Sequence, residues 1–161
     1  MKTCKRLAIA ILSVAASSCT VKIPKNLPEP ATCTYKEYTL EEFTNVKDYD
    51  HLKFKDRDII FVRLTDVTDA DLSDWYSNMK NAFHNKSIAT YLELAENDSL
   101  TTISDYAFSD FDCLVSITLP QSVKTVGNYA FQNCKSLRWA IIKNQKDSVS
   151  VQDDAFNGCH Q

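Results

Sequence analysis

Six cysteines and three histidines are the residues of this chain that could bind a metal ion or act as nucleophile and base. Zinc and redox sites usually place two cysteines, or a cysteine and a histidine, only a few residues apart. No Cys-x-x-Cys occurs, and His160 beside Cys159 is the only histidine close to a cysteine. The sequence therefore predicts no metal site and no redox motif.

Motifs of catalysis are also missing from the chain. It contains no Gly-x-Ser-x-Gly, phosphate-binding loop, dinucleotide fingerprint or His-Glu-x-x-His. The acidic run DVTDADLSDW at 66–75 lacks the spacing and the glycine of an EF-hand, and a helix dipole favours acidic residues at a helix start. We therefore predict a protein that is not an enzyme and needs no cofactor. A hydrolase with His51 or His84 as its base is the remaining catalytic alternative.

Cys19 stands in a different setting, at the end of an N-terminal targeting pattern. The basic start MKTCKR precedes the apolar run LAIAILSVAA at 7–16, which is shorter than the roughly 20 residues of a membrane-spanning helix. Small residues then lead directly to Cys19. The pattern is typical of a secretion signal and resembles the lipobox of bacterial lipoproteins, which implies that Cys19 is lipidated. The alternative is ordinary signal cleavage with Cys19 incidental.

The segment that follows has the composition of a tether. Pro24, Pro28 and Pro30 make an extended, semi-rigid chain. We therefore expect a lipoprotein signal peptide at 1–18 and a tether at 19–34, which would hold the protein on the bacterial cell envelope, at the outer membrane or cell surface. The formal net charge of -3 gives no reason to expect binding to nucleic acid.

An internal repeat organises the C-terminal part of the chain. Ala-Phe pairs at 107–108, 130–131 and 155–156 are 23 and 25 residues apart. Around each pair the same apolar positions recur, in the columns Ile103, Val126, Val151; Phe111, Cys134, Cys159; Leu114, Leu137; Ile117, Ala140; and Leu119, Ile142. A unit of this size cannot bury its own apolar face, so the pattern predicts stacked coils of a solenoid.

The repeats LTTISDYAFSDFDCLVSITLP and VKTVGNYAFQNCKSLRWAII resemble BspA-like leucine-rich repeats. The resemblance covers residues 100–159 and implies an α/β solenoid with parallel strands on a concave face. For 35–99 the sequence predicts an N-terminal cap region. Within it, strand, helix and strand occupy 57–95: IIFVRL at 59–64 is a strand, 68–83 has an apolar stripe at helical spacing, and Leu92 with Leu94 mark the second strand. A shorter helix is predicted to begin at Thr39.

Four predicted strands can be aligned by this period: FVRL, YLEL, SITL and WAII. Because side chains alternate along a strand, half of their residues should point away from the core. These outward residues are Phe61, Tyr91, Ser116 and Trp139 in one column and Arg63, Glu93, Thr118 and Ile141 in the next. Exposed aromatic residues and arginine are enriched at binding sites. Two alternatives remain open: another segment covers the aromatic residues, or the register slips by one residue.

These observations predict a non-catalytic, secreted, lipid-anchored leucine-rich repeat protein. Its role would be protein–protein interaction or adhesion at the envelope, with a protein or other extracellular macromolecule as partner. The alternative is a structural or accessory subunit of an envelope complex. Cys134 and Cys159 share a column with Phe111 and so indicate apolar packing. Disulfides are possible outside the cytoplasm, but the sequence leaves the pairing of Cys33, Cys113, Cys134 and Cys159 open.

Overall fold

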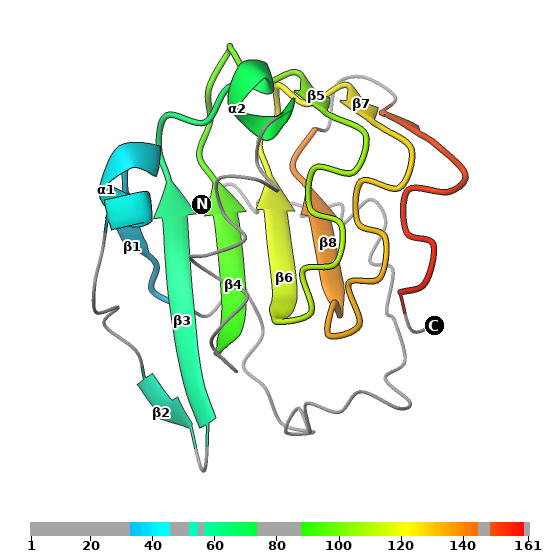
Figure 1. Cartoon of the computed structure of the whole chain (residues 1–161). Coiled ribbons are helices and arrows are strands. Elements are labelled where there is room, and N and C mark those ends of the chain that lie inside the picture. Colours follow the sequence, from blue (N-terminus) through cyan, green and yellow to red (C-terminus); the bar gives the residue numbers. More distant parts are fainter. Residues whose placement is uncertain (1–32, 46–51, 55–56, 74–87, 145–148, 160–161) are drawn as a thin grey trace, which may run out of the picture.

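A computed structural model describes residues 33–45, 52–54, 57–73, 88–144 and 149–159, and Figure 1 shows their arrangement. The chain winds as a solenoid of about three turns, with a large sheet on one side and a small sheet on the other. All strand pairs except one are parallel in the described part. The predicted short solenoid with parallel strands is confirmed.

The two sheets are built from alternating segments of the chain. The large sheet has the order β1-β3-β4-β6-β8, with β2 antiparallel to β3. The small sheet has the order β5-β7-β9. The strands are β1 (Lys36–Tyr38), β2 (Leu52–Phe54), β3 (Arg57–Leu64), β4 (Ala89–Leu94), β5 (Thr102–Ile103), β6 (Leu114–Leu119), β7 (Thr125–Val126), β8 (Trp139–Ile142) and β9 (Ser150–Val151).

Two short helices, α1 (Leu40–Asn45) and α2 (Asp69–Ser73), begin where the sequence predicts them. At α1 the Thr39 N–H donates to Glu42 Oε2 at 2.9 Å, and the Glu42 N–H donates to Thr39 Oγ1 at 3.1 Å. This reciprocal pair is a capping box, which satisfies backbone donors that a helix start leaves open. The later parts of the predicted helices, 46–51 and 74–83, lie outside the described residues.

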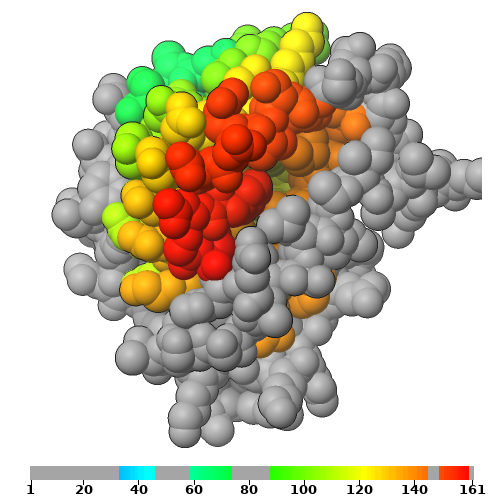
Figure 2. Space-filling model, turned by 90° about the vertical axis from the view of Figure 1, so that its right-hand side faces the viewer, coloured from blue at the N-terminus to red at the C-terminus, as the bar shows by residue number. Residues whose placement is uncertain are grey.

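The repeat columns of the sequence become ladders that run from coil to coil. Ile103 pairs with Val126 and Val126 with Val151 in the small sheet. The rings of Phe108, Phe131 and Phe156 stack nearly parallel, with centroids 5.2 Å and 5.0 Å apart. Figure 2 looks onto the last coil, in red, with the earlier coils behind it in sequence order. Equivalent residues therefore bury one another, as the solenoid interpretation requires.

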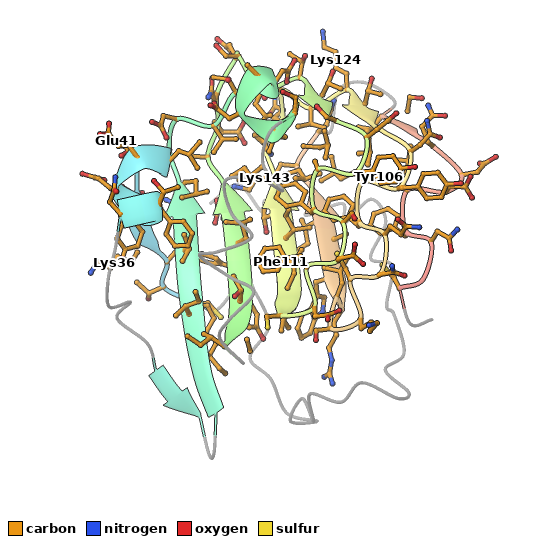
Figure 3. All side chains as sticks on the ribbon, in the orientation of Figure 1. Lys36, Glu41, Tyr106, Phe111, Lys124 and Lys143 are labelled. Atoms are coloured by element: carbon orange, nitrogen blue, oxygen red, sulfur yellow. The ribbon has the colours of Figure 1, made fainter. Side chains whose placement is uncertain are left out.

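The main core lies between the two sheets and is continuous. It extends from Phe43 of α1 to Cys159 of the last coil. Its large-sheet side is formed by the two predicted inward columns, Val62, Leu92, Ile117 and Ala140, then Leu64, Leu94, Leu119 and Ile142. Phe111 packs in this interior, where Figure 3 labels it. The core thus joins the predicted cap region to the repeats.

A turn position in each coil requires left-handed backbone. Asp110, Asn133 and Gly158 have φ values of 58°, 56° and 74° and occupy equivalent places in successive coils. Glycine, asparagine and aspartate adopt this conformation at the lowest cost. The Asn133 side chain also donates from Nδ2 to Asp110 Oδ1 at 2.9 Å. These three residues stand two positions after the phenylalanine of each repeat, so the sequence carries this signal outside the apolar columns.

Three features of the N-terminal part were not predicted. β1 pairs in parallel with the edge of β3, and β2 forms an antiparallel pair with the start of β3. At the small sheet, the Asp69 carboxylate accepts the N–H groups of Thr101 and Thr102 at 2.7 Å and 2.8 Å. Asp69 therefore closes the free edge of the first coil beside β5 with a side chain instead of another strand.

Candidate interaction face

The register predicted for the large sheet is confirmed residue by residue. Phe61 pairs with Tyr91, Tyr91 with Ser116, and Ser116 with Trp139. In the next column Arg63, Glu93, Thr118 and Ile141 are partners in the same order. We call the face formed by these eight residues the outer face of the large sheet, because it is the opposite side from the main core. The alternative of a one-residue slip is excluded.

Aromatic rings form a row across the outer face. Tyr35, just before β1, meets Phe61 edge-on at 5.9 Å, and Phe61 lies 4.7 Å from Tyr91 between ring centroids. Tyr91 and Trp139 are 6.1 Å apart although β6 lies between their strands. Ser116 is the β6 residue of this column, and its small side chain leaves room for the two rings to approach over it.

The expected exposure of this face is wrong at its centre. Tyr91 and Ser116 are fully buried, and Glu93 and Thr118 are nearly so. A second apolar cluster explains this, because Ile59, Ala89 and Val115 pack with Tyr91, and the rings beside it lean against them. Burial also raises the pKa of the Tyr91 phenol. Phe61, Arg63, Trp139 and Ile141 remain half-buried and border the closed centre.

Part of the cover comes from the segment before β1. Cys33 and Tyr35 pack against the second apolar cluster, and so do Phe61 and Trp139. Burial raises the pKa of the Tyr35 phenol as well. This observation favours, for the centre of the face, the alternative that another segment covers the aromatic residues. The covering residues themselves could not be named from the sequence, since Cys33 and Tyr35 follow a proline-containing stretch with no repeat pattern.

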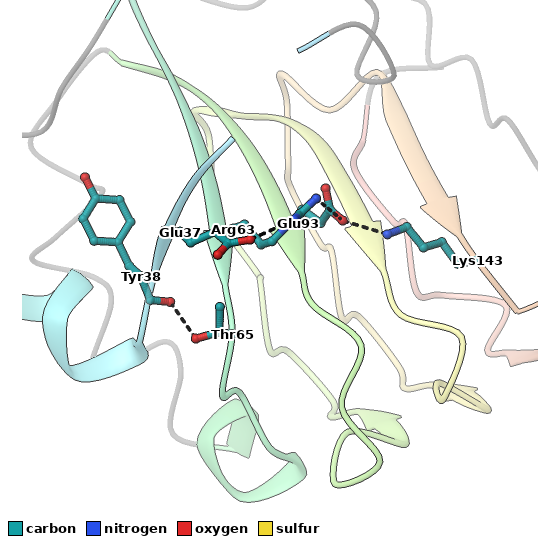
Figure 4. Close-up of polar contacts among 6 residues, drawn as sticks. All are labelled: Glu37, Tyr38, Arg63, Thr65, Glu93 and Lys143. Atoms are coloured by element: carbon teal, nitrogen blue, oxygen red, sulfur yellow. Dashed lines mark hydrogen bonds and ion pairs between the residues drawn. The ribbon is translucent and has the colours of Figure 1, made fainter. Parts of the chain in front are cut away.

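A row of four charged side chains crosses the strands next to the column of aromatic residues, and Figure 4 shows these charged residues. Arg63 contacts Glu37 at 2.9 Å and Glu93 at 3.2 Å, and Lys143 contacts Glu93 at 2.7 Å. Arg63 and Glu93, which are neighbours in the predicted outward column, form an ion pair, whereas Glu37 and Lys143 were not expected here. The hydrogen bond with Glu37 and the proximity of Glu93 raise the pKa of the Arg63 guanidinium. The row is balanced in charge and joins β1, β3, β4 and the end of β8.

The other candidate residues do not form a chemical site in the described part of the chain. Cys19, His51, His84 and His160 lie outside the described residues. Where the structure describes the chain, no group of three or more histidine, cysteine, aspartate and glutamate side chains could hold a metal ion. Within the same ranges, no helix has the length and apolar character needed to cross a membrane.

Four cysteines lie in the described part of the chain: Cys33 and Cys113 are half-buried, and Cys134 and Cys159 are buried thiols. Cys134 and Cys159 are buried in the main core, which confirms that their column is one of apolar packing. Their thiols donate to the carbonyls of Phe108 and Phe131 at 3.1 Å and 3.0 Å.

Comparison with protein families gives one match. The family described as BspA type leucine rich repeat region (6 copies) matches residues 77–161, just over half of the chain. The match covers β4 to β9 and starts upstream of the repeats read from residue 100. Comparisons with curated proteins and with solved structures found no match.

Proposed function

Because the chain belongs to the BspA-type leucine-rich repeat family, we propose that it is a non-catalytic protein that binds another protein through the outer face of its large sheet. The repeat family suggests protein–protein interaction, and a leucine-rich repeat solenoid is typically non-catalytic. The half-buried residues that border the closed centre support the outer face as the binding surface.

Those residues have the character of an interface. Phe61 and Trp139 hold their rings on neighbouring aromatic side chains, so little side-chain entropy would be lost when a partner contacts them. Arg63 is held by Glu37 and Glu93, which fixes its guanidinium group in place. Tryptophan and arginine are among the residues that contribute most to binding energy. Ile141 extends the apolar part of this surface on β8.

The test is to remove outer-face contact without unfolding the sheet. Trp139→Ala and Ile141→Ser alter half-buried side chains, whereas Tyr91→Ala would remove a fully buried ring and serves as a packing control. Tyr106→Ala is the matched surface control, because Tyr106 is 50% exposed and lies on the coil segment away from the large sheet, as labelled in Figure 3. Each variant is checked by circular dichroism and used to capture proteins from envelope and host extracellular extracts, followed by binding assays with the purified protein captured.

We expect Trp139→Ala and Ile141→Ser to remain folded and to weaken binding of the captured protein at least tenfold, while Tyr106→Ala binds like the wild type. Equal binding by all three folded variants would rule out the outer face as the binding surface. Recovery of a fixed, stoichiometric complex would favour an accessory subunit of an envelope complex over an adhesin with a transient partner.

The proposal also includes the location of the protein, which we infer to be the bacterial cell envelope. The N-terminal pattern that ends at Cys19 supports secretion and lipid attachment at the bacterial envelope. A chain expressed in a bacterium that processes lipoproteins should incorporate a labelled fatty acid and partition into detergent. Cys19→Ala should lose both properties and retain the fold. Incorporation of the label in Cys19→Ala would show that the anchor is elsewhere, and absence of label in the wild type would remove the anchor from the proposal.

A further inference from the structure

Cys134 and Cys159 hold equivalent positions in two successive coils. Both lie in the column that begins with Phe111 in the coil before them. Cys134 is fully buried and Cys159 is 9% exposed. Their thiols contact one another, and this contact is the main influence on the acidity of Cys159. The function proposed above uses neither thiol.

The backbone around the two cysteines is held in register. The Phe131 N–H donates to the Ala155 carbonyl at 2.8 Å, and the Asn133 N–H donates to the Asn157 carbonyl at 2.9 Å. Chains bonded in this way run about 4.8 Å apart. Disulfides span Cα separations of roughly 4.4–6.8 Å, so this register brings the two cysteines within the range of a covalent bond.

Loss of the thiol hydrogens would leave no buried carbonyl without a donor. The Phe108 carbonyl, which accepts the Cys134 thiol, also accepts the Phe111 N–H at 3.3 Å. The Phe131 carbonyl, which accepts the Cys159 thiol, also accepts the Cys134 N–H at 3.2 Å. An unsatisfied buried acceptor is costly, and oxidation of this pair avoids that cost.

We propose that Cys134 and Cys159 are a site of disulfide formation, which joins the last two described coils when the protein meets a small-molecule disulfide such as glutathione disulfide. The Cys159 thiolate attacks one glutathione sulfur and releases one glutathione thiolate, which leaves a mixed disulfide. The Cys134 thiolate then attacks the Cys159 sulfur and releases the second glutathione. Each cysteine gives up one proton and one electron, and glutathione disulfide accepts both electrons.

The structure sets the order of these steps. Cys159 retains some exposure and Cys134 has none, so the oxidant reaches Cys159 first. Contact with the Cys134 thiol lowers the pKa of Cys159, which favours its thiolate form, whereas burial raises the pKa of Cys134. The equivalent residue of the preceding coil is Phe111, so this column can form only one such bond in the described coils.

The experiment uses the full, folded chain equilibrated with mixtures of oxidised and reduced glutathione. After acid quenching, free thiols are blocked and the chain is cut with trypsin. Cleavage after Lys124, Lys135 and Lys146 places Cys134 in peptide 125–135 and Cys159 in peptide 147–161. We expect these two peptides as the main disulfide-linked species, lighter by two hydrogen atoms than the reduced pair. Chain oxidised in urea serves as the unfolded reference.

Two variants make the result specific. Cys113→Ser should leave the linked peptide unchanged, since Cys113 has no part in the bond. Cys134→Ser should instead trap Cys159 as the mixed disulfide with glutathione. The proposal is overturned if Cys159 of the folded chain links mainly to Cys33 or Cys113. It is also overturned if both thiols stay reduced in a mixture that oxidises the urea-unfolded chain.

Discussion

At the scale of single residues, Gly127 shows how closely the coils pack. A Cβ atom there would collide with the Asp105 carboxylate and lie 2.8 Å from the Asp105 backbone nitrogen and 3.0 Å from the Ile103 carbonyl oxygen. The carboxylate could rotate away, but the two backbone atoms belong to the preceding coil and cannot. The same carboxylate also accepts the Asn128 N–H at 2.7 Å, which ties the two coils together at this point.

We therefore expect Gly127→Ala to lower the free energy of unfolding by about 1–3 kcal/mol, as overpacking does elsewhere. Urea denaturation at neutral pH measures the change. Gln152→Ala, at the equivalent place in the next coil, is the control, because Gln152 is exposed and its replacement should matter by less than about 0.5 kcal/mol. Equal stability of the two variants would show that the coils can separate at Gly127 without cost.

Asp69 gives a second prediction at this scale. Its carboxylate accepts two N–H groups of the first coil and the Thr101 hydroxyl at 2.8 Å. Asp69→Ala should cost about 1–3 kcal/mol, because it leaves these donors without their acceptor at the sheet edge. Asp98→Ala, at an exposed aspartate, should have almost no effect. A similar loss of stability in both variants would mean that removal of a negative charge, and not the loss of the contact at the sheet edge, lowers the free energy of unfolding.

The cost of Asp69→Ala should also depend on pH. Burial raises the pKa of Asp69, but the hydrogen bonds from Thr102 and Thr101 outweigh it and hold the pKa below its usual value. A carboxylate with a lowered folded pKa stabilises fully above its unfolded pKa of about 3.9 and ceases to do so as pH falls through the folded pKa. The difference between wild type and Asp69→Ala should therefore shrink in acid, as denaturation curves at descending pH would show.

At the scale of elements, the charge row on the outer face leads to two predictions about stability that can be compared with each other. Glu93, whose side chain is 9% exposed, bonds two cations, whereas Glu37, at 60%, bonds only Arg63. Glu93→Ala should cost about 1–2 kcal/mol, less than for a fully buried pair, because Arg63 and Lys143 can turn to water. Glu37→Ala should cost under about 1 kcal/mol. Chemical denaturation of both variants compares them, and the reverse order would contradict the arrangement of the row.

The elements also show which parts of the fold can be read from sequence. The ladders were predictable because each coil repeats the same apolar positions, and matched positions specify strand register as well as strand location. β1 was not predictable, because Lys36–Tyr38 has no apolar alternation and is a strand only through its pairing with β3. Cover of Tyr91 by another segment was left open as an alternative, but the covering residues could not be named, since Cys33 and Tyr35 come from a segment without repeats.

At the scale of the whole molecule, the continuous main core predicts cooperative unfolding. Phe43 near the N-terminal edge and Cys159 in the last coil belong to one packed cluster, with no break between the cap region and the repeats. We expect one thermal transition with the same midpoint by near- and far-ultraviolet circular dichroism. Phe43→Ala should lower the midpoint of the whole transition in both the near- and the far-ultraviolet spectra. A second transition unaffected by Phe43→Ala would instead show that the coils unfold as independent units.

The hydrogen bonds between the turns of successive coils have a consequence for assembly. At the turns they run in one direction: Tyr106, Phe108 and Asp110 donate their N–H groups to the coil that follows, and Phe131 and Asn133 do the same one coil later. Beside the small sheet the direction is reversed, because the N–H groups of Gly127 and Gln152 donate to carbonyls of the preceding coil. At the turns, therefore, the two sides of a coil are chemically unlike, one offering donors and the other carbonyls. Coils can continue the pattern only when stacked head to tail. Two molecules that met through the same side with their turns aligned would place donor against donor at the turns, so the row of turns gives the solenoid two different ends.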